Sequence, residues 1–213
     1  MSRLPSVCGV ILAAGESTRM GTDKALLPWP PAGPGAPSTG QTFLSAAIQS
    51  LNPFSEMVIV VAGRNEPNVA PVVYANGGFV VTNPAPERGQ LSSLQLALRE
   101  VLNHGRDAAI VTLVDRPPTK AETLKTLLAA FASAAPGIWS VVPEHGGKHG
   151  HPFVVGREMM EVFLKAPAAT NARDIEHQYR QHVEYVAVPD PAVTLNVDTP
   201  QDYAALSSSA LPS

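Results

Sequence analysis

Hydrophobic residues follow two alternating patterns along the chain, short continuous runs and helical stripes. Five apolar runs have the length of strands that are buried on both faces: residues 7–12, 57–62, 78–82, 108–113 and 138–142. Between them, apolar residues recur at intervals of three and four, as in helices with one buried face: residues 44–51, 94–102 and 124–131. This alternation predicts an α/β fold, a single-domain, Rossmann-like, mostly parallel sheet flanked by helices.

The last third of the chain is less regular. Apolar runs predict strands at residues 151–155 and 183–188, and helical stripes predict helices at residues 157–164 and 172–179. Thr199 followed by Pro200 predicts the start of a final helix, because threonine caps helices and proline fits their first position. We expect this part to form a smaller region beside the main sheet.

Two segments interrupt these patterns. Residues 28–40 (PWPPAGPGAPSTG) predict a loop insertion, and residues 207–213 predict a disordered tail, so the expected domain occupies residues 1–206. Thr119 and Glu122 have the spacing of a capping box, which predicts a helix that begins just after Thr119.

Composition narrows the classes of protein to be considered. A length of 213 residues corresponds to about 1.4 domains of average size, which favours one domain. The formal charge of −3 disfavours a nucleic-acid-binding protein. One cysteine cannot form an intrachain disulfide, and the chain has neither a long apolar segment nor a secretory signal at its start. We therefore expect a soluble cytoplasmic protein without a membrane segment.

The loop after the first predicted strand carries the first candidate chemistry. Gly15 and the small residues before it allow backbone N–H groups to approach an anion, and Arg19 and Lys24 supply positive charge. The segment matches neither the Walker A pattern nor GxGxxG. Taken by themselves, these residues are equally compatible with an ordinary strand-to-helix loop.

Residues 12–24 (LAAGESTRMGTDK) resemble the signature L-A-A-G-x-S-x-R-M-G-x-x-K of nucleotidyltransferases, and they match it at every fixed position. Further matches extend to Tyr203, and the sequence is most similar to the molybdenum cofactor cytidylyltransferase group. The resemblance implies catalytic roles for Arg19 and Lys24. It also implies that this loop binds the nucleotide through Leu12, Ala13, Ala14, Gly15, Arg19 and Lys24.

The loop after the third predicted strand, residues 83–94, combines a glycine with polar residues at a helix start. One interpretation is a plain helix cap by Ser92, with Ser93 just inside the helix. The segment also resembles the family motif N-P-x-x-x-x-G-x-x-S-S, which lies against the nucleotide base. That resemblance implies nucleotide-binding roles for Asn83, Gly89, Gln90, Ser92 and Ser93.

Two aspartates are candidate metal ligands. Asp115 follows a buried strand directly, where a carboxylate is well placed to hold Mg²⁺, although a turn-forming aspartate before Pro117 is the alternative. The resemblance implies that Asp115 is catalytic and binds metal, and that Asp198 is a second ligand. Asp198 also precedes a capped helix and could serve only its dipole. Arg116 departs from the family, which usually has Gln or Met there, and this leaves the acceptor preference open.

Three of the six histidines lie within residues 145–151, on a glycine-rich segment. A zinc site is disfavoured, because no cysteine or matched acidic partner occurs at zinc spacing, and a flexible solvated loop is a second alternative. Gly150-His151-Pro152 resembles a Gly-His-Pro sequence of the molybdenum cofactor group. That resemblance implies that the acceptor is bound by Lys148, His149 and His151.

The resemblance thus implies a Mg²⁺-dependent enzyme that transfers CMP from CTP to the phosphate of molybdopterin and releases pyrophosphate. Its partners would be an NTP, a phosphorylated acceptor and a recipient molybdoenzyme, without nucleic acid or membrane. A GTP-using molybdenum cofactor guanylyltransferase, a methylerythritol-phosphate cytidylyltransferase and a sugar-phosphate nucleotidyltransferase are alternatives within the same enzyme class. A non-catalytic carrier of a nucleotide-bearing cofactor is the alternative from another class.

Overall fold

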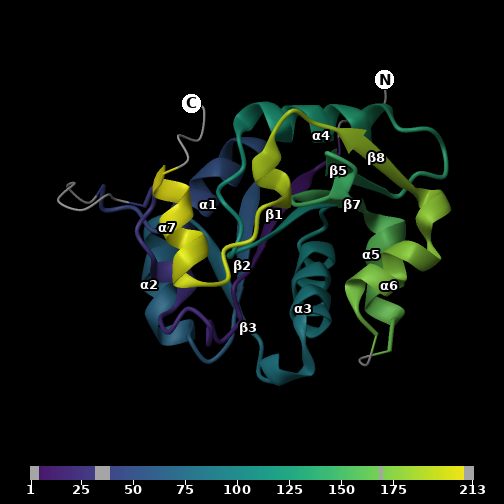
Figure 1. Ribbon diagram of the computed structural model, residues 1–213. Helices are drawn as coiled ribbons and strands as arrows, with labels where there is room; N and C mark the ends of the chain where they lie inside the picture. Colours follow the sequence, from purple (N-terminus) through teal and green to yellow (C-terminus); the bar gives the residue numbers. More distant parts are fainter. Residues whose placement is uncertain (1–4, 32–38, 168–169, 209–213) are drawn as a thin grey trace.

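A computed structural model describes residues 5–31, 39–167 and 170–208, and contains one mixed sheet with helices packed on it (Figure 1). The strands are β1 (Val7–Leu12), β2 (Met57–Ala62), β3 (Phe79–Thr82), β4 (Ala108–Leu113), β5 (Ser140–His145), β6 (Lys148–His149), β7 (Phe153–Gly156) and β8 (Val183–Ala187). The α-helices are α1 (Phe43–Leu51), α2 (Glu66–Ala75), α3 (Gln90–Asn103), α4 (Ala121–Ser133), α5 (Arg157–Lys165), α6 (Ala172–Gln178) and α7 (Pro200–Ser208). Short 3₁₀ turns include η1 (Lys24–Leu26), η3 (Pro86–Arg88) and η5 (Pro191–Thr194).

The sheet order is β3-β2-β1-β4-β7-β5-β6, with β8 paired to β5. Strands β3, β2, β1 and β4 are parallel to one another, whereas β7 runs antiparallel between β4 and β5. The predicted α/β class with a mostly parallel sheet is confirmed. Each antiparallel pair contains β6 or β7, which lie in the part of the chain where the sequence pattern is less regular.

Strand β1 lies at the centre of the hydrophobic core, and its alternate side chains serve opposite faces of the sheet. Cys8 and Val10 belong to the cluster that packs against α3 and α5, while Ile11 belongs to the cluster on the other face, against α1, α2 and α4. All three side chains are fully buried. Burial of a side chain such as Ile11 stabilises the fold by about 1.5–3 kcal/mol. The same burial fixes where β1 ends and where its loop begins.

Helix α7 is attached to the rest of the molecule by a separate small cluster, which contains Phe43 and Leu206. The Trp29 ring packs edge-on against Phe43, with the ring centroids 4.8 Å apart. The Tyr203 hydroxyl donates to the carbonyl oxygen of Pro28 at 2.8 Å. These contacts hold the carboxyl-terminal helix beside the segment that follows η1, far from it in sequence (Figure 1).

Several predicted boundaries differ from the structure. The predicted capping box at Thr119 is wrong, because α4 begins at Ala121 and its N-cap is Lys120. Glu122 therefore occupies the second helical position, whereas a capping box needs an acid at the third. Helix α7 continues to Ser208, two residues into the expected tail, and residues 209–213 lie outside the described residues. In the expected insertion, Pro28 bridges to Thr42 and residues 32–38 lie outside the described part of the chain. Within the described ranges, no helix is long and apolar enough to cross a bilayer.

Strands β5 and β6 form a tight hairpin, and the base of this hairpin, at Gly150, packs against η5. Gly146 and Gly147 adopt φ angles of 56° and 74°, which suit the two central positions of a hairpin turn. At the base of the hairpin, Gly150 donates to the carbonyl oxygen of Pro143 at 2.9 Å. A Cβ atom on Gly150 would lie 2.1 Å from the carbonyl oxygen of Val193. Only glycine therefore allows the hairpin to approach η5 this closely.

We expect Gly150→Ala to lower the free energy of unfolding by at least about 2 kcal/mol, because backbone must move to relieve the contact with Val193. Urea denaturation followed by circular dichroism measures this change. Gly15→Ala is the matched control, since a Cβ there meets no atom within 4 Å, and its stability should stay close to that of the unmodified protein. Equal stability of the two variants would contradict the prediction.

Candidate active site

The loop between β1 and η1 turns back on itself beside the carboxyl end of the sheet. The carbonyl oxygen of Ser17 accepts hydrogen bonds from the N–H groups of Met20 and Gly21, at 3.0 and 3.2 Å. The Ser17 hydroxyl accepts from the N–H of Lys24 at 3.1 Å. A side chain at Gly15 would meet nothing within 4 Å, so the loop is open there. These features leave the backbone open at Gly15, where the family resemblance implies nucleotide binding.

Two polar residues that the sequence analysis did not single out support this loop. Asp23 caps η1 by accepting from the N–H of Ala25 at 3.0 Å, and it also accepts from the Asn65 amide at 2.8 Å. The same amide donates to the carbonyl oxygen of Ala13 at 3.0 Å. Asn65 lies in the loop after β2. Its position beyond the carboxyl end of a parallel strand is the only signal in the sequence that could have identified it.

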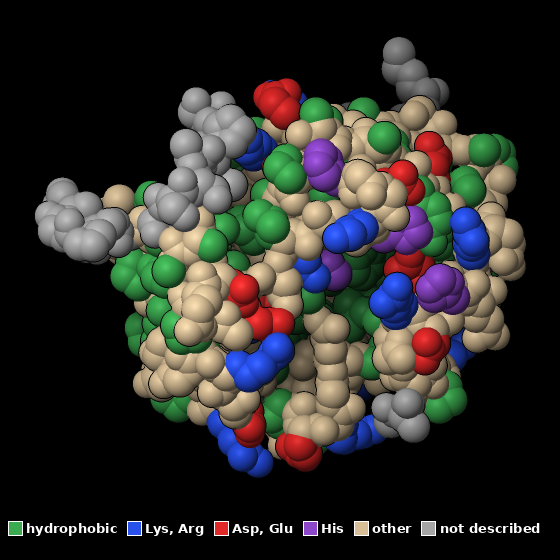
Figure 2. Space-filling view, viewed as in Figure 1, with side chains coloured by type: hydrophobic (Ala, Val, Ile, Leu, Met, Phe, Trp, Pro, Cys, Tyr) green, Lys and Arg blue, Asp and Glu red, His purple; other side chains and the backbone are tan. Residues whose placement is uncertain are grey.

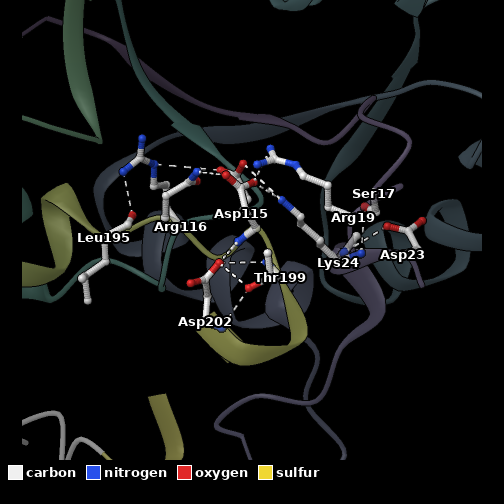
Figure 3. A network of polar contacts seen from close by, with 12 residues as sticks. Ser17, Arg19, Asp23, Lys24, Asp115, Arg116, Leu195, Thr199 and Asp202 are labelled. Carbon is white, nitrogen blue, oxygen red and sulfur yellow. Dashed lines mark hydrogen bonds and ion pairs between the residues drawn. The ribbon is translucent and has the colours of Figure 1, made fainter. Parts of the chain in front are cut away.

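Lys24, Asp115 and Asp198 come together although they are far apart in the sequence. Figure 3 shows Lys24 directed toward Asp115. The Lys24 Nζ atom lies 2.6 Å from Asp198 Oδ1 and 3.7 Å from Asp115 Oδ2. The two carboxylate oxygens therefore cannot be farther apart than these two distances added together. The Arg19 guanidinium approaches Asp198 to 3.1 Å from a largely exposed position. The structure thus places four of the predicted residues in one cluster.

Backbone contacts explain how the two acids meet. The N–H of Val197 donates to the carbonyl oxygen of Asp115 at 2.9 Å, which attaches the segment before α7 to the loop after β4. The Asp202 carboxylate accepts from the N–H groups of Asp198 and Thr199, at 3.0 and 2.8 Å. Thr199 caps α7 as the sequence predicts, since its hydroxyl accepts from the N–H of Asp202 at 3.2 Å, and Asp202 in return fixes the backbone of Asp198 and Thr199.

The environments of the two acids shift their pKa values in opposite directions. Burial raises the pKa of Asp115, although the positive charges of Lys24 and Arg116 partly offset this effect. The hydrogen bond from Lys24 lowers the pKa of Asp198, and the charge of Arg19 adds to it. Asp115 Oδ1 is buried and has no hydrogen-bond partner. This oxygen is thus available to a cation or to a hydrogen-bond donor of a ligand.

A cavity of about 180 Å³, termed here the central cavity, lies between the glycine-rich loop and the start of α3. Its lining includes most residues predicted to bind the nucleotide, namely Leu12, Ala14, Gly15, Lys24, Gly89, Gln90 and Ser93, together with the predicted metal ligand Asp115. Asn83 and Ser92 are buried and do not line it. The Asn83 amide instead donates to the hydroxyls of Ser92 and Ser93, both at 2.9 Å. These bonds hold the loop after β3 against α3.

The interpretation of Ser92 as the helix cap is wrong. Helix α3 begins at Gln90 with Gly89 at its N-cap, where the φ angle is 93°. The Ser92 hydroxyl lies inside the first turn and donates to the carbonyl oxygen of Gly89 at 2.7 Å. Glycine is favoured there because its backbone adopts positive φ angles without a clash.

A larger cavity of about 540 Å³, termed here the histidine cavity, adjoins the central one, and Gln90 lines both. Lys148, His149 and His151, the three predicted acceptor-binding residues, all contribute to its lining. Lysine, arginine and histidine side chains surround a hollow on the face shown in Figure 2. The structure therefore brings together this group of predicted residues as well.

The histidines of this segment do not lie on a flexible loop, because His145 and His149 belong to the paired strands β5 and β6. The His149 ring stacks on Tyr185, with the ring centroids 3.7 Å apart. The Tyr185 hydroxyl donates to Glu176 at 3.0 Å, and burial, with the charge of Glu176, raises the pKa of Tyr185 to about 12. Among the described residues, no three His, Cys, Asp or Glu side chains are grouped to hold a metal ion.

His151 is half-buried at the histidine cavity, and one of its ring nitrogens is shielded from solvent. Its Nδ1 atom is buried without a hydrogen-bond partner, and its ring lies edge-on to Phe153 with the centroids 5.6 Å apart. Burial, with the nearby charge of Arg116, lowers the pKa of His151 to about 3. The imidazole is therefore neutral near pH 7, and a hydrogen-bonding group of a ligand would satisfy its free nitrogen.

Comparisons with known proteins agree with this arrangement. The family profile described as "MobA-like NTP transferase domain" matches residues 9–184. The chain is 32% identical over 127 residues to a "Probable molybdenum cofactor guanylyltransferase" of Rhodopirellula baltica, an alignment that covers 60% of this chain and 56% of that relative. It is 26% identical over 199 residues to the "Molybdenum cofactor cytidylyltransferase" of Escherichia coli, covering 91% and 92%.

Solved structures share the whole fold. Rv0371c from Mycobacterium tuberculosis H37Rv superposes with a TM-score of 0.79 at 28% identity, covering 98% of this chain and 100% of that one. A structure of Rv0371C in complex with manganese has a TM-score of 0.75 at 26% identity, covering 96% and 99%. The family thus uses a divalent metal, which agrees with the carboxylates at the central cavity.

His151 makes stability depend on pH. The unfolded chain takes up a proton near the ordinary pKa of 6.5, and the folded chain only near pH 3. Below pH 6.5 the unfolded state therefore binds more protons, and the free energy of unfolding falls as the pH falls. We expect the wild type to lose about 1–2 kcal/mol more than His151→Asn between pH 7 and pH 5.

Urea denaturation at pH 7, 6 and 5 measures this difference. His104→Asn is the control, because His104 is an exposed residue at the end of α3, and its stability should fall with pH as in the wild type. An unchanged pH dependence in His151→Asn would contradict the assignment of a neutral imidazole.

Proposed function

We propose, since this chain belongs to the family of the MobA-like NTP transferase domain, that it transfers CMP from CTP to the phosphate of molybdopterin and releases pyrophosphate. The observation that carries this proposal is the cluster of Lys24, Asp115 and Asp198 beside the central cavity. The relatives that support the acceptor include both cytidylyl- and guanylyltransferases. The alignment with the cytidylyltransferase of E. coli supports CTP, and an equally extensive alignment with a guanylyltransferase of Mycobacterium avium keeps GTP as the second candidate.

The site residues fit a divalent cation. Asp115 and Asp198 supply carboxylate oxygens within reach of one ammonium group, and Asp115 Oδ1 has no hydrogen-bond partner. Mg²⁺ prefers one or two carboxylates together with phosphate oxygens. We propose that these two acids hold Mg²⁺, which would supply positive charge to offset the negative charge that develops during transfer.

The chain's own residues position the nucleotide and neutralise its charge. Lys24 and Arg19 would move from the carboxylates to oxygens of the triphosphate, while the open backbone near Gly15 approaches the same anion. The backbone at Leu12, Ala13 and Ala14, with Gly89, Gln90 and Ser93, would hold the nucleoside. Asn83 and Ser92 would act indirectly, by fixing the loop after β3 and the first turn of α3.

The proposed reaction needs no covalent intermediate with the protein. An oxygen of the acceptor phosphate forms a bond to the α-phosphorus of CTP, and the bond from that phosphorus to the bridging oxygen breaks. Pyrophosphate leaves with the electron pair. Correct placement of two bound reactants can contribute about 7–11 kcal/mol to such a step. The histidine cavity, with Lys148, His149 and His151, would bind the acceptor.

The proposal also specifies which base the nucleotide carries. GTP is the second candidate, because guanylyltransferases are among the relatives. A ligand that binds only the folded state raises its stability by about 2.7 kcal/mol at 100 times the dissociation constant. We expect CTP with Mg²⁺ to raise the melting temperature more than GTP, ATP or UTP. A larger shift with GTP would replace CTP by GTP in the proposal.

Turnover separates an enzyme from a carrier that delivers the cofactor to a molybdoenzyme. We expect Asp115→Asn and Asp198→Asn each to reduce pyrophosphate release from CTP and molybdopterin at least about 100-fold, because each removes a charged metal ligand. Glu16→Gln is the control, an exposed acid of the same loop, and should keep near-normal turnover. Binding of CTP without pyrophosphate release in the wild type would indicate a carrier instead.

A further inference from the structure

Arg116 lies between the two cavities, and the proposed function does not use it. Asp115 lines the central cavity, and the next residue, Arg116, lines the histidine cavity. In Figure 3 Asp115 lies between Arg116 and Lys24. The Arg116 Nε atom is 3.9 Å from Asp115 Oδ1. A ligand group in contact with Arg116 would therefore lie next to the carboxylate that faces the nucleotide.

The Arg116 guanidinium is only partly satisfied by the protein. One nitrogen, Nη1, donates to the carbonyl oxygen of Leu195 at 2.6 Å, whereas the buried Nε atom has no hydrogen-bond partner. The side chain is 18% exposed. His151 lines the same cavity and also has a buried nitrogen without a partner. Two side chains that line this cavity thus each carry a buried polar atom without a hydrogen-bond partner, as expected where a ligand completes the site.

The charge of the histidine cavity indicates which ligand this is. Its lining contains Arg116, Lys148 and Arg173 but a single carboxylate, Glu176, although the whole chain carries a net charge of −3. Burial lowers the pKa of Arg116, but an arginine stays charged near neutral pH. A guanidinium binds two oxygens of one phosphate at once, which glutamine or methionine at this position would not do.

We propose that Arg116 binds a phosphomonoester group of the acceptor and orients one of its oxygens across Asp115 toward the central cavity. This inference rests on the proposed function and deepens it, because it makes Arg116 the residue that selects acceptors ending in a phosphate. His151 contributes its free nitrogen to the same group. The bond with Leu195 suggests a purely structural alternative, in which Arg116 only steadies the segment that carries Asp198.

Inorganic phosphate is a probe that does not depend on the identity of the acceptor. In protein with ¹⁵N-labelled histidines, we expect phosphate to shift the ring signals of His151 saturably, with His151→Asn used for assignment. Arg116→Gln should weaken this response at least tenfold, and Arg116→Lys should restore part of it. Arg99→Gln, which removes an exposed cation of α3 that lines neither cavity, should stay within about twofold of the wild type.

A response in Arg116→Gln within twofold of the wild type would overturn the proposal, as would no saturable response in the wild type. Kinetics provide the second measurement. With molybdopterin, Arg116→Gln should raise the acceptor KM at least tenfold and leave the CTP KM within twofold. A fall in kcat with both KM values unchanged would instead support the structural role. Absence of turnover in the wild type would refute the proposed function, while the phosphate titration would still decide the role of Arg116.

Discussion

The site depends on one ionic contact, the ammonium group of Lys24 between the carboxylates of Asp115 and Asp198. Two acids at this distance repel each other, and burial makes the charge of Asp115 still less favourable. The lysine compensates both charges, and a cation of higher charge can replace it once a polyanion attracts the lysine. The same contact thus stabilises the free protein and, under the proposed function, would prepare the site for a nucleotide with its metal.

Much of the fold follows from the sequence, because each central strand is an uninterrupted apolar run that can only be buried on both faces. Strands β1, β2 and β4 therefore coincide with their predicted ranges. Helix α2 was not predicted, since Pro67 lies in its first turn, Pro71 lies inside it, and only Val69, Ala70 and Val73 are buried. Its place is decided by packing on the sheet, which has no local signature.

The site residues likewise divide into those that local sequence predicts and those that only tertiary contacts bring into place. Lys24 and Asp115 stand in motifs next to strand ends, so local sequence and the family resemblance point to them together. The approach of Asp198 depends on the bond between Val197 and the backbone of Asp115, a tertiary contact that no local pattern predicts. Asn65 was missed for that reason, and Asn83 is recognised as a buried support only once its two serine partners are known.

The attachment of α7 has a consequence for thermal behaviour. Asp198 belongs to no strand, and the helix behind it is held by the small cluster around Phe43 rather than by the sheet. Segments with few buried contacts open at a lower free-energy cost than the core. On warming, this chain would lose its second carboxylate by local detachment while the sheet stays intact, so inactivation would precede global melting.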